Sequence, residues 1–100
     1  MYKILETEIF SNLLTNLKDI QGKVSILRRI KRLHVGNFGD FKYLENSIYE
    51  LRIKTGPGYR VYYTKKDEKI ILLLIGGDKS TQQKDIKKAK TILKEYSNEW

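Results

Sequence analysis

The sequence predicts an α+β fold in which a helical hairpin packs on a twisted, mostly antiparallel sheet with a C-terminal helix. Apolar residues recur at helical spacing near both ends of the chain and alternate with polar residues in its middle. The chain contains one proline and no repeat or Pro/Ser-rich linker. We therefore expect continuous elements joined by short turns, in the order βααβββα.

The N-terminal part is expected to form a short strand over residues 2–5, followed by two antiparallel helices. Thr7 and Asp19 are positioned to cap these helices, and the second helix should end before Gly36. The expected apolar stripes consist of Ile9, Phe10, Leu13, Leu14 and Leu17 in the first helix and of Ile20, Val24, Leu27 and Ile30 in the second. The cations that face away from the second stripe are Lys23, Arg28, Arg29, Lys31 and Arg32.

The middle of the chain has the two-residue period that is typical of strands. Residues 48–54 and 59–64 are predicted to form a β-hairpin around a turn at 55–58, with one aromatic and aliphatic face and one charged face. Residues 41–44 can add an edge strand, which extends the order to βααββββα. The apolar run over residues 69–75 should be a central strand that is covered on both faces.

The last helix is expected after this apolar strand, which Gly76 to Lys79 should end. Ser80 and Gln83 match a capping box that opens the helix. Its apolar side is predicted to consist of Ile86, Ala89, Leu93 and Tyr96.

Length and composition limit the possible classes of protein. A chain of 100 residues is expected to form a single domain over residues 1–100. It contains no cysteine, which excludes disulfides and thiolate metal sites. The first ten residues do not resemble a signal peptide, and no apolar run is long enough to span a membrane. We expect a soluble, cytoplasmic protein with no membrane partner.

The charge balance is the most informative bulk property. The chain has 20 Lys and Arg against 12 Asp and Glu, a formal net charge of +8 at pH 7. This excess attracts polyanions, so nucleic acid is the first expected partner and an acidic protein the second. An ordinary basic surface is the alternative that charge alone leaves open.

Cations gather on the charged face of the predicted β-hairpin. The residues that share this face are Arg52, Lys54, Arg60 and Tyr62. Only Glu50 offsets their charge. A solvated sheet face is the plain alternative, but three cations beside a tyrosine favour a surface that cradles phosphates and stacks an unpaired base. Lysines of the last helix, such as Lys84, either extend this RNA-binding surface or form the solvated side of that helix.

Such residues can cleave RNA without a metal or cofactor when the neighbouring 2′-hydroxyl attacks the phosphorus. Arg52 and Arg60 would stabilise the developing negative charge. Proton transfer could involve Lys54, Lys79 or Tyr62, because cationic surroundings lower the pKa of such groups, and the sequence leaves open which of them acts. The single histidine and the scattered carboxylates predict no metal site, and we place that histidine outside the functional site.

Two long motifs carry a family resemblance. Residues 50–63 include Gly-Pro-Gly-Tyr-Arg-Val-Tyr-Tyr, and residues 73–86 include Gly-Gly-Asp-Lys-Ser-Thr-Gln-Gln-Lys-Asp. Together with residues 32–33 and 36–40, these stretches resemble the HigB-like addiction-module killer proteins of the RelE/ParE toxin superfamily. The resemblance covers almost the whole chain.

The resemblance implies a RelE-like fold and a toxin that cleaves mRNA in the ribosomal A site until a cognate antitoxin neutralises it. In HigB-type operons the antitoxin is usually a HigA-like helix-turn-helix protein. The resemblance implies that the toxin–antitoxin pair contacts operator DNA only through this antitoxin. The arginine of the Gly-Tyr-Arg motif, a catalytic cation in RelE toxins, maps onto Arg60. Lys79 replaces an arginine after the last strand.

Some positions depart from the RelE pattern. Ile48 and Glu50 stand where RelE has lysines, and Asp85 lies near the position of its catalytic tyrosine. The residues that would have to supply the missing groups are Arg52, Lys54 and Tyr62. Two other functions stay open, since ParE relatives bind and inhibit DNA gyrase and a basic domain can also bind nucleic acid without enzymatic activity.

Overall fold

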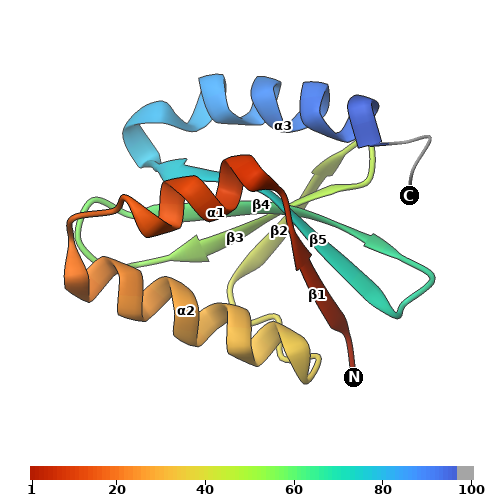
Figure 1. Ribbon diagram of the computed structural model, residues 1–100, viewed down its shortest axis with the longest axis horizontal. Coiled ribbons are helices and arrows are strands. Elements are labelled where there is room, and N and C mark those ends of the chain that lie inside the picture. Colours follow the sequence, from red (N-terminus) through yellow and green to blue (C-terminus); the bar gives the residue numbers. More distant parts are fainter. Residues whose placement is uncertain (97–100) are drawn as a thin grey trace.

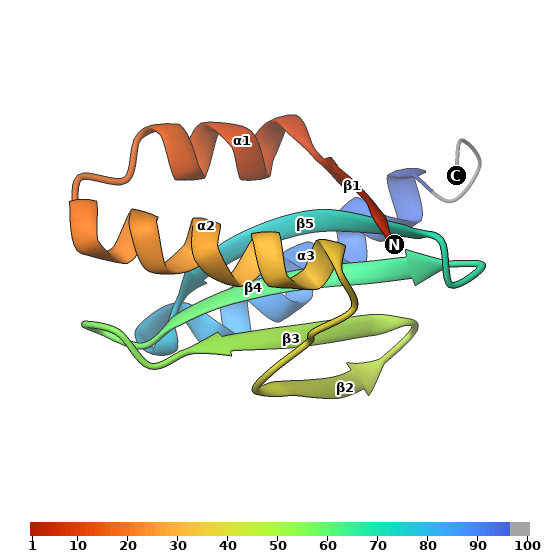
Figure 2. The same ribbon diagram turned by 90° about the horizontal axis from the view of Figure 1, so that it is seen from below.

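The structure, a computed structural model that describes residues 1–96, has three layers (Figures 1 and 2). Two helices cover one face of a five-stranded sheet, and a third helix covers the other face. The helices are α1 (Glu8–Thr15), α2 (Ile20–His34) and α3 (Gln82–Tyr96). The strands are β1 (Lys3–Glu6), β2 (Phe41–Glu45), β3 (Ile48–Ile53), β4 (Tyr59–Lys66) and β5 (Ile70–Asp78), and a short 3₁₀ helix, η1 (Lys79–Thr81), links β5 to α3. The predicted α+β class is confirmed.

The sheet has the strand order β1-β5-β4-β3-β2. β1 pairs with β5 in parallel and all other neighbours are antiparallel, which confirms a mostly antiparallel sheet. The optional edge strand is present as β2. β5 is an interior strand whose apolar residues are buried because α1 packs on one of its faces and α3 on the other. The middle strand of the sheet is β4.

Side chains cap both helices of the hairpin, as the sequence predicts. Thr7 Oγ1 accepts a 3.0 Å hydrogen bond from the Phe10 amide, and Asp19 Oδ1 accepts one of 3.1 Å from the Gly22 amide. These bonds satisfy backbone donors that the first turn of a helix leaves unpaired. α1 and α2 then run side by side in opposite directions (Figures 1 and 2).

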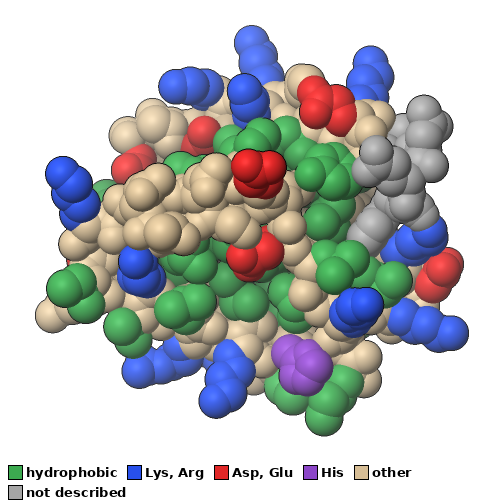
Figure 3. Space-filling model, in the orientation of Figure 1, with side chains coloured by type: hydrophobic (Ala, Val, Ile, Leu, Met, Phe, Trp, Pro, Cys, Tyr) green, Lys and Arg blue, Asp and Glu red, His purple; other side chains and the backbone are tan. Residues whose placement is uncertain are grey.

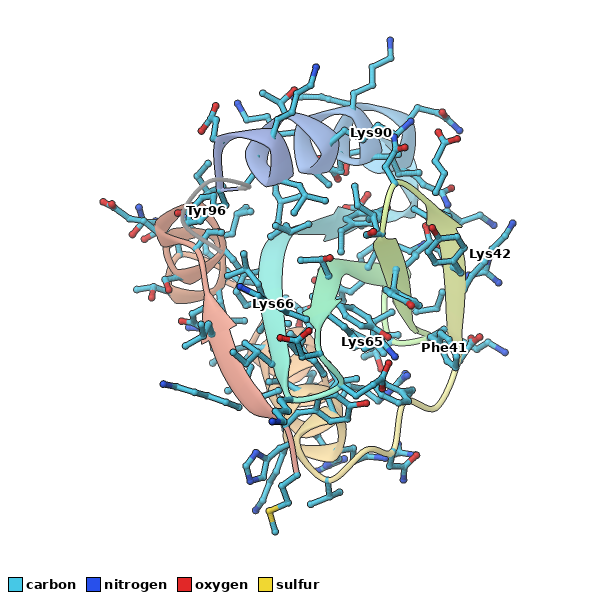
Figure 4. The ribbon with its side chains drawn as sticks, turned by 90° about the vertical axis from the view of Figure 1, so that its right-hand side faces the viewer. Phe41, Lys42, Lys65, Lys66, Lys90 and Tyr96 are labelled. Atoms are coloured by element: carbon cyan, nitrogen blue, oxygen red, sulfur yellow. The ribbon has the colours of Figure 1, made fainter. Side chains whose placement is uncertain are left out.

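Each face of the sheet has its own apolar core. The hairpin-side core contains Phe10, Ile26 and Leu33 of the helices with Leu51, Ile53, Tyr59, Val61, Tyr63, Ile71 and Leu73 of the sheet. The opposite core contains Ala89 and Ile92 of α3 with Ile48, Tyr62, Leu72, Leu74 and Ile75. α3 also reaches the edge strand, where Lys90 forms an ion pair with Glu45 (Figure 4). The sequence predicted that one face of the β3–β4 hairpin is charged. This prediction is wrong for part of that face, because α3 buries it.

The end of β5 and the start of the last helix differ from the prediction. β5 continues through Gly76 and Gly77 to Asp78, because these residues pair with β4. The capping residue is Asp78 and not Ser80, since Asp78 Oδ1 accepts a 2.8 Å hydrogen bond from the Ser80 amide. Thr81 completes the capping box by accepting a 3.3 Å bond from the Asp78 amide. The helix thus begins only after η1.

None of the helices in residues 1–96 has the length and hydrophobicity of a membrane-spanning segment. The same residues contain no group of three or more histidine, cysteine or acidic side chains arranged to hold a metal ion.

α2 offers a test of how strongly the fold depends on the hairpin-side core. Leu33 is fully buried there, whereas Leu27 of the same helix is 48% exposed. Leu33→Ala should lower the free energy of unfolding by about 2–5 kcal/mol, because it removes buried apolar area and leaves a cavity. Leu27→Ala should have a much smaller effect. Urea unfolding followed by circular dichroism measures both variants, and equal losses would contradict this description of the core.

Candidate functional site

A pocket opens at one end of the sheet, where the β3–β4 turn lies beside the start of η1. Its cavity volume is about 500 Å³. The residues that line it are Asp40, Arg52, Ile53, Lys54, Gly56, Pro57, Gly58, Arg60 and Lys79. We call it the cationic pocket. It brings together four of the residues that the sequence predicted for the site, namely Arg52, Lys54, Arg60 and Lys79.

Strand pairing places the two arginines of the pocket. Arg52 of β3 and Arg60 of β4 are direct partners in the antiparallel register, and Arg60 in turn faces Gly77 of β5. Like charges at directly opposite positions repel each other. The two side chains are only 35% and 14% exposed, so solvent screens this repulsion incompletely. A negative charge close to both arginines would offset this repulsion.

Glu50 supplies this negative charge from a fully buried position. Its Oε1 accepts a 2.9 Å hydrogen bond from Arg52 Nε and lies 3.8 Å from Arg60 Nη1, while its Oε2 accepts a 2.7 Å bond from Gln82 Nε2. Burial alone would raise the pKa of Glu50, but the hydrogen bonds and the two arginine charges outweigh burial and lower this pKa. Glu50 is therefore ionised at neutral pH.

Gly77 allows the chain after β5 to pack closely beside the pocket. A Cβ atom at Gly77 would lie 1.9 Å from Asp85 Oδ2 and 2.8 Å from Thr81 Oγ1. That space is occupied because Asp85 is buried and accepts a 2.6 Å hydrogen bond from the Thr81 hydroxyl. The missing side chain at Gly77 thus lets the start of α3 approach the strand position opposite Arg60.

The β3–β4 turn at the pocket is fastened to α2. Gly56 and Gly58 have φ angles of +55° and +81°, a left-handed conformation that favours glycine, as the predicted turn requires. Tyr59, which precedes Arg60, donates a 2.7 Å hydrogen bond to Oδ2 of Asp19, the residue that caps α2. This bond, with burial and the Asp19 charge, raises the pKa of Tyr59 to about 12. The tyrosine therefore stays a protonated donor and holds the turn against the helix.

Arg29 supports the site through hydrogen bonds that the sequence does not reveal. Its position in the helical pattern only places it among the cations of α2. Its Nη1 donates a 2.5 Å hydrogen bond to the Arg52 carbonyl. Its Nη2 donates to the carbonyls of Phe38 and Asp40 at 3.0 and 3.2 Å. Arg29 thereby holds the loop before β2 against β3, at the rim of the cationic pocket.

Tyr62 lies in the core under α3 and does not line the cationic pocket. The sequence predicted an accessible ring that could stack on a base, but Tyr62 is fully buried. Burial and the charges of Glu50 and Asp85 raise the pKa of Tyr62, so the expected lowering of this pKa is wrong. The alternating pattern misled here because it cannot show that α3 covers this part of β4.

Two other residues considered in the sequence also lie away from the pocket. Lys84 is exposed near the start of α3, where it lines a separate surface cavity with Gln83, Lys87, Lys88 and Thr91. A role of Lys84 in RNA binding stays a prediction. His34 is at the far end of α2, with its Nδ1 2.6 Å from the Tyr2 carbonyl oxygen.

The helical hairpin, the mostly antiparallel sheet, α3 and the cationic pocket define a small basic protein of the α+β class. Residues 12–97 match the family model "Phage derived protein Gp49-like (DUF891)". The chain therefore belongs to the Gp49-like family, a family of toxin-like proteins of the RelE/HigB type from addiction modules. The match is to this family and not to HigB in particular.

A relative matches the chain over almost the whole length of both proteins. The chain is 50% identical over 93 residues to a protein of Haemophilus influenzae (strain ATCC 51907 / DSM 11121 / KW20 / Rd) that is named "Uncharacterized protein". The aligned region covers 93% of this chain and 94% of the relative. Membership of the Gp49-like family indicates the toxin of a toxin–antitoxin pair and hence an antitoxin as partner.

The cationic pocket leads to a prediction about nucleic-acid binding. Arg60→Ala and Lys79→Ala should each weaken the binding of a single-stranded RNA oligonucleotide and reduce its dependence on salt, because each removes a phosphate contact. Lys31→Ala removes an exposed cation of α2 and should weaken binding less, although the net charge falls equally. Fluorescence anisotropy at several salt concentrations measures this. The same loss in all three variants would mean that only net charge matters.

Proposed function

We propose that this toxin cleaves mRNA on translating ribosomes without a metal ion. The observation that carries the proposal is the convergence of four cationic side chains on one pocket. The RNA backbone carries a phosphate at every nucleotide, and cations gathered around one cavity suit it better than cations spread over the surface. The ribosome as the place of cleavage is supported by the resemblance to RelE toxins.

The proposed reaction is an attack by the 2′-hydroxyl of one nucleotide on the neighbouring phosphorus. The bond from phosphorus to the 5′-oxygen of the next nucleotide breaks, which leaves a 2′,3′-cyclic phosphate and a 5′-hydroxyl end. A base takes the proton of the 2′-hydroxyl, and an acid gives a proton to the leaving oxygen. Negative charge grows on the non-bridging oxygens, where Arg52 and Arg60 would stabilise it.

Lys54 and Lys79 are the groups that we assign to proton transfer. Both line the cationic pocket, and the side chain of Lys54 is 90% exposed, with Nζ 4.0 Å from Asp40 Oδ2. An amine can accept the proton of the 2′-hydroxyl and an ammonium group can protonate the leaving oxygen. Tyr62 is left out because its hydroxyl is buried and its pKa is raised.

Substitutions at three positions test the proposed chemistry. Arg60→Ala should slow single-turnover cleavage of mRNA on programmed ribosomes by about 10²-fold or more, because it removes a preorganised charge from the transition state. Tyr62→Phe and Lys31→Ala should cleave at nearly the rate of the natural protein. Primer extension on translated mRNA measures the cuts, and undiminished cleavage by the Arg60→Ala variant would contradict the proposal.

The same purified protein distinguishes the other two functions that the sequence leaves open. Inhibition of DNA supercoiling by gyrase, with intact mRNA, would select gyrase binding. Harmless overexpression with salt-dependent RNA affinity would select a binding module without enzymatic activity.

A second surface, formed by α1 and α2, supports the proposal that the antitoxin is an acidic protein. Large apolar side chains of the hairpin helices are between 38% and 76% exposed, namely Ile9, Leu13, Ile20, Val24 and Leu27. We call these residues the hairpin surface. Figure 3 shows hydrophobic side chains between and beside α1 and α2, lysine and arginine side chains around the edge of this face, and acidic side chains near its middle. An apolar area with a charged rim is typical of a protein interface.

Charge favours one kind of partner for the hairpin surface. α2 contains no acidic residue, and Arg28 and Lys31 follow Val24 and Leu27 by one helical turn. A second copy of this chain would bring two such sets of cations together, and each copy has a net charge of +8. An amphipathic antitoxin segment with acidic side chains would complement both the apolar residues and the cations.

The hairpin surface predicts a toxin that escapes neutralisation. Val24→Glu combined with Leu27→Glu should stay toxic when the antitoxin is co-expressed, because the acidic side chains repel the antitoxin and remove apolar contacts. Tyr43→Glu is the control, since Tyr43 is 52% exposed but lies on the edge strand β2. Growth after co-induction and co-purification with the antitoxin measure the effect. Undiminished neutralisation of the double variant would rule out this surface.

A further inference from the structure

A buried carboxylate lies next to the cationic pocket. Glu50 has no exposed surface, and its two oxygens contact Arg52, Arg60 and Gln82. Its negative charge reduces the positive potential that the pocket can offer to RNA. A side chain that only filled this part of the core would stabilise the fold at least as well if it were apolar, because buried ion pairs rarely recover their full desolvation penalty. The position of Glu50 therefore calls for another explanation.

The contacts of Glu50 indicate what it does for the two arginines. Arg52 Nε and Arg60 Nη1 lie 2.9 and 3.8 Å from the same carboxylate oxygen. Without an anion between them, these cross-strand partners would repel each other and turn apart. Both side chains also line the pocket, so guanidinium donors that Glu50 does not hold can face a ligand there, with the exception of the buried Arg60 Nε.

We infer that Glu50 is a positioning residue, which fixes the guanidinium groups of Arg52 and Arg60 for the phosphate that is cleaved. Gln82 holds the carboxylate from the first residue of α3 and thereby ties this arrangement to the packing of the helix. Glu50 itself does not touch RNA, because it is buried. The inference rests on the proposed nuclease function.

A positioning role and a purely electrostatic role predict opposite results for Glu50→Gln. The amide keeps the shape of the side chain and raises the net charge of the protein by one. If the arginines acted only through their charge, RNA binding and cleavage would both improve. If Glu50 positions them, the cleavage rate falls while the affinity for the substrate stays equal or increases.

The test is single-turnover cleavage of mRNA on programmed ribosomes. Glu50→Gln should cleave at least about 10-fold more slowly at saturating ribosomes, with an unchanged or lower half-saturating concentration, because small displacements of catalytic groups have large effects on rate. Glu45→Gln is the matched control, since it removes an exposed carboxylate that pairs with Lys90 away from the pocket. An unchanged rate for Glu50→Gln, or an equal loss for Glu45→Gln, would overturn the inference.

Two further variants keep the test decisive. In the Arg60→Ala background, Glu50→Gln should cause less additional loss than it does alone, because part of its effect passes through Arg60. Fully additive losses would count against the inference. If Glu50→Gln proves unfolded in a thermal melt, Gln82→Ala decides, since it removes one hydrogen bond to Glu50 from a partly exposed residue. It should lower the rate without raising the half-saturating concentration, and an unchanged rate would overturn the inference.

A measurement without RNA separates this inference from the proposed function. In nitrogen-15 NMR spectra, the Nε–H signal of Arg52 should be shifted and exchange slowly with water because Glu50 accepts its hydrogen bond. Both properties should weaken in Glu50→Gln, because a neutral amide oxygen accepts this hydrogen bond less strongly than a carboxylate, and they should persist in Glu45→Gln. If the natural protein cleaves no mRNA, the proposed function fails, and these spectra still decide whether Glu50 holds the arginine. An unaltered Arg52 signal in Glu50→Gln would overturn the inference.

Discussion

The sheet carries apolar side chains on both of its faces, and the need to cover both faces determines most of the remaining structure. The helical hairpin covers one face, so α3 has to cross the other. Because the chain first completes β5 and η1, α3 begins at Gln82, which reaches Glu50 but does not line the cationic pocket. The pocket is thus the part of this face that the last helix leaves open.

The cations in that opening repel one another, and a buried group of the core compensates part of their charge. Arg52 and Arg60 face each other across two strands and are shielded from solvent, so water screens their repulsion poorly. One buried carboxylate, Glu50, contacts both. The glycine opposite Arg60 leaves room for the start of α3 and its network around Asp85. Packing and electrostatics of the pocket therefore depend on the same few residues.

The two surfaces to which we assign function belong to different layers of the molecule. The hairpin surface lies on α1 and α2, whereas the cationic pocket is formed mainly by β3, the β3–β4 turn, β4 and the start of η1. They are physically connected at the N-terminal end of α2. There Asp19 caps the helix and accepts the hydrogen bond of Tyr59, the neighbour of Arg60. A partner bound along the hairpin would thus lie on elements that hold the pocket in place.

Features that depend on near neighbours in the chain could be predicted from the amino-acid sequence. The caps at Thr7 and Asp19, the β3–β4 turn and the strand face shared by Arg52 and Arg60 follow from local hydrogen bonding and from the two-residue period of strands. Lys79 was a candidate for proton transfer from the residues themselves and a counterpart of a RelE arginine from the family resemblance, and it lines the same pocket.

The accessibility of side chains on the charged face depends instead on how distant elements pack, and it could not be predicted from local patterns. Tyr62 is buried and Lys84 lies apart from the pocket because α3 packs across β4 and β5. Glu50 looked like a stray opposing charge in the sequence, yet its contacts to Arg60 and Gln82 make it central to the pocket. Such contacts join residues that are far apart in the chain, and no local spacing encodes where a helix will cross a sheet.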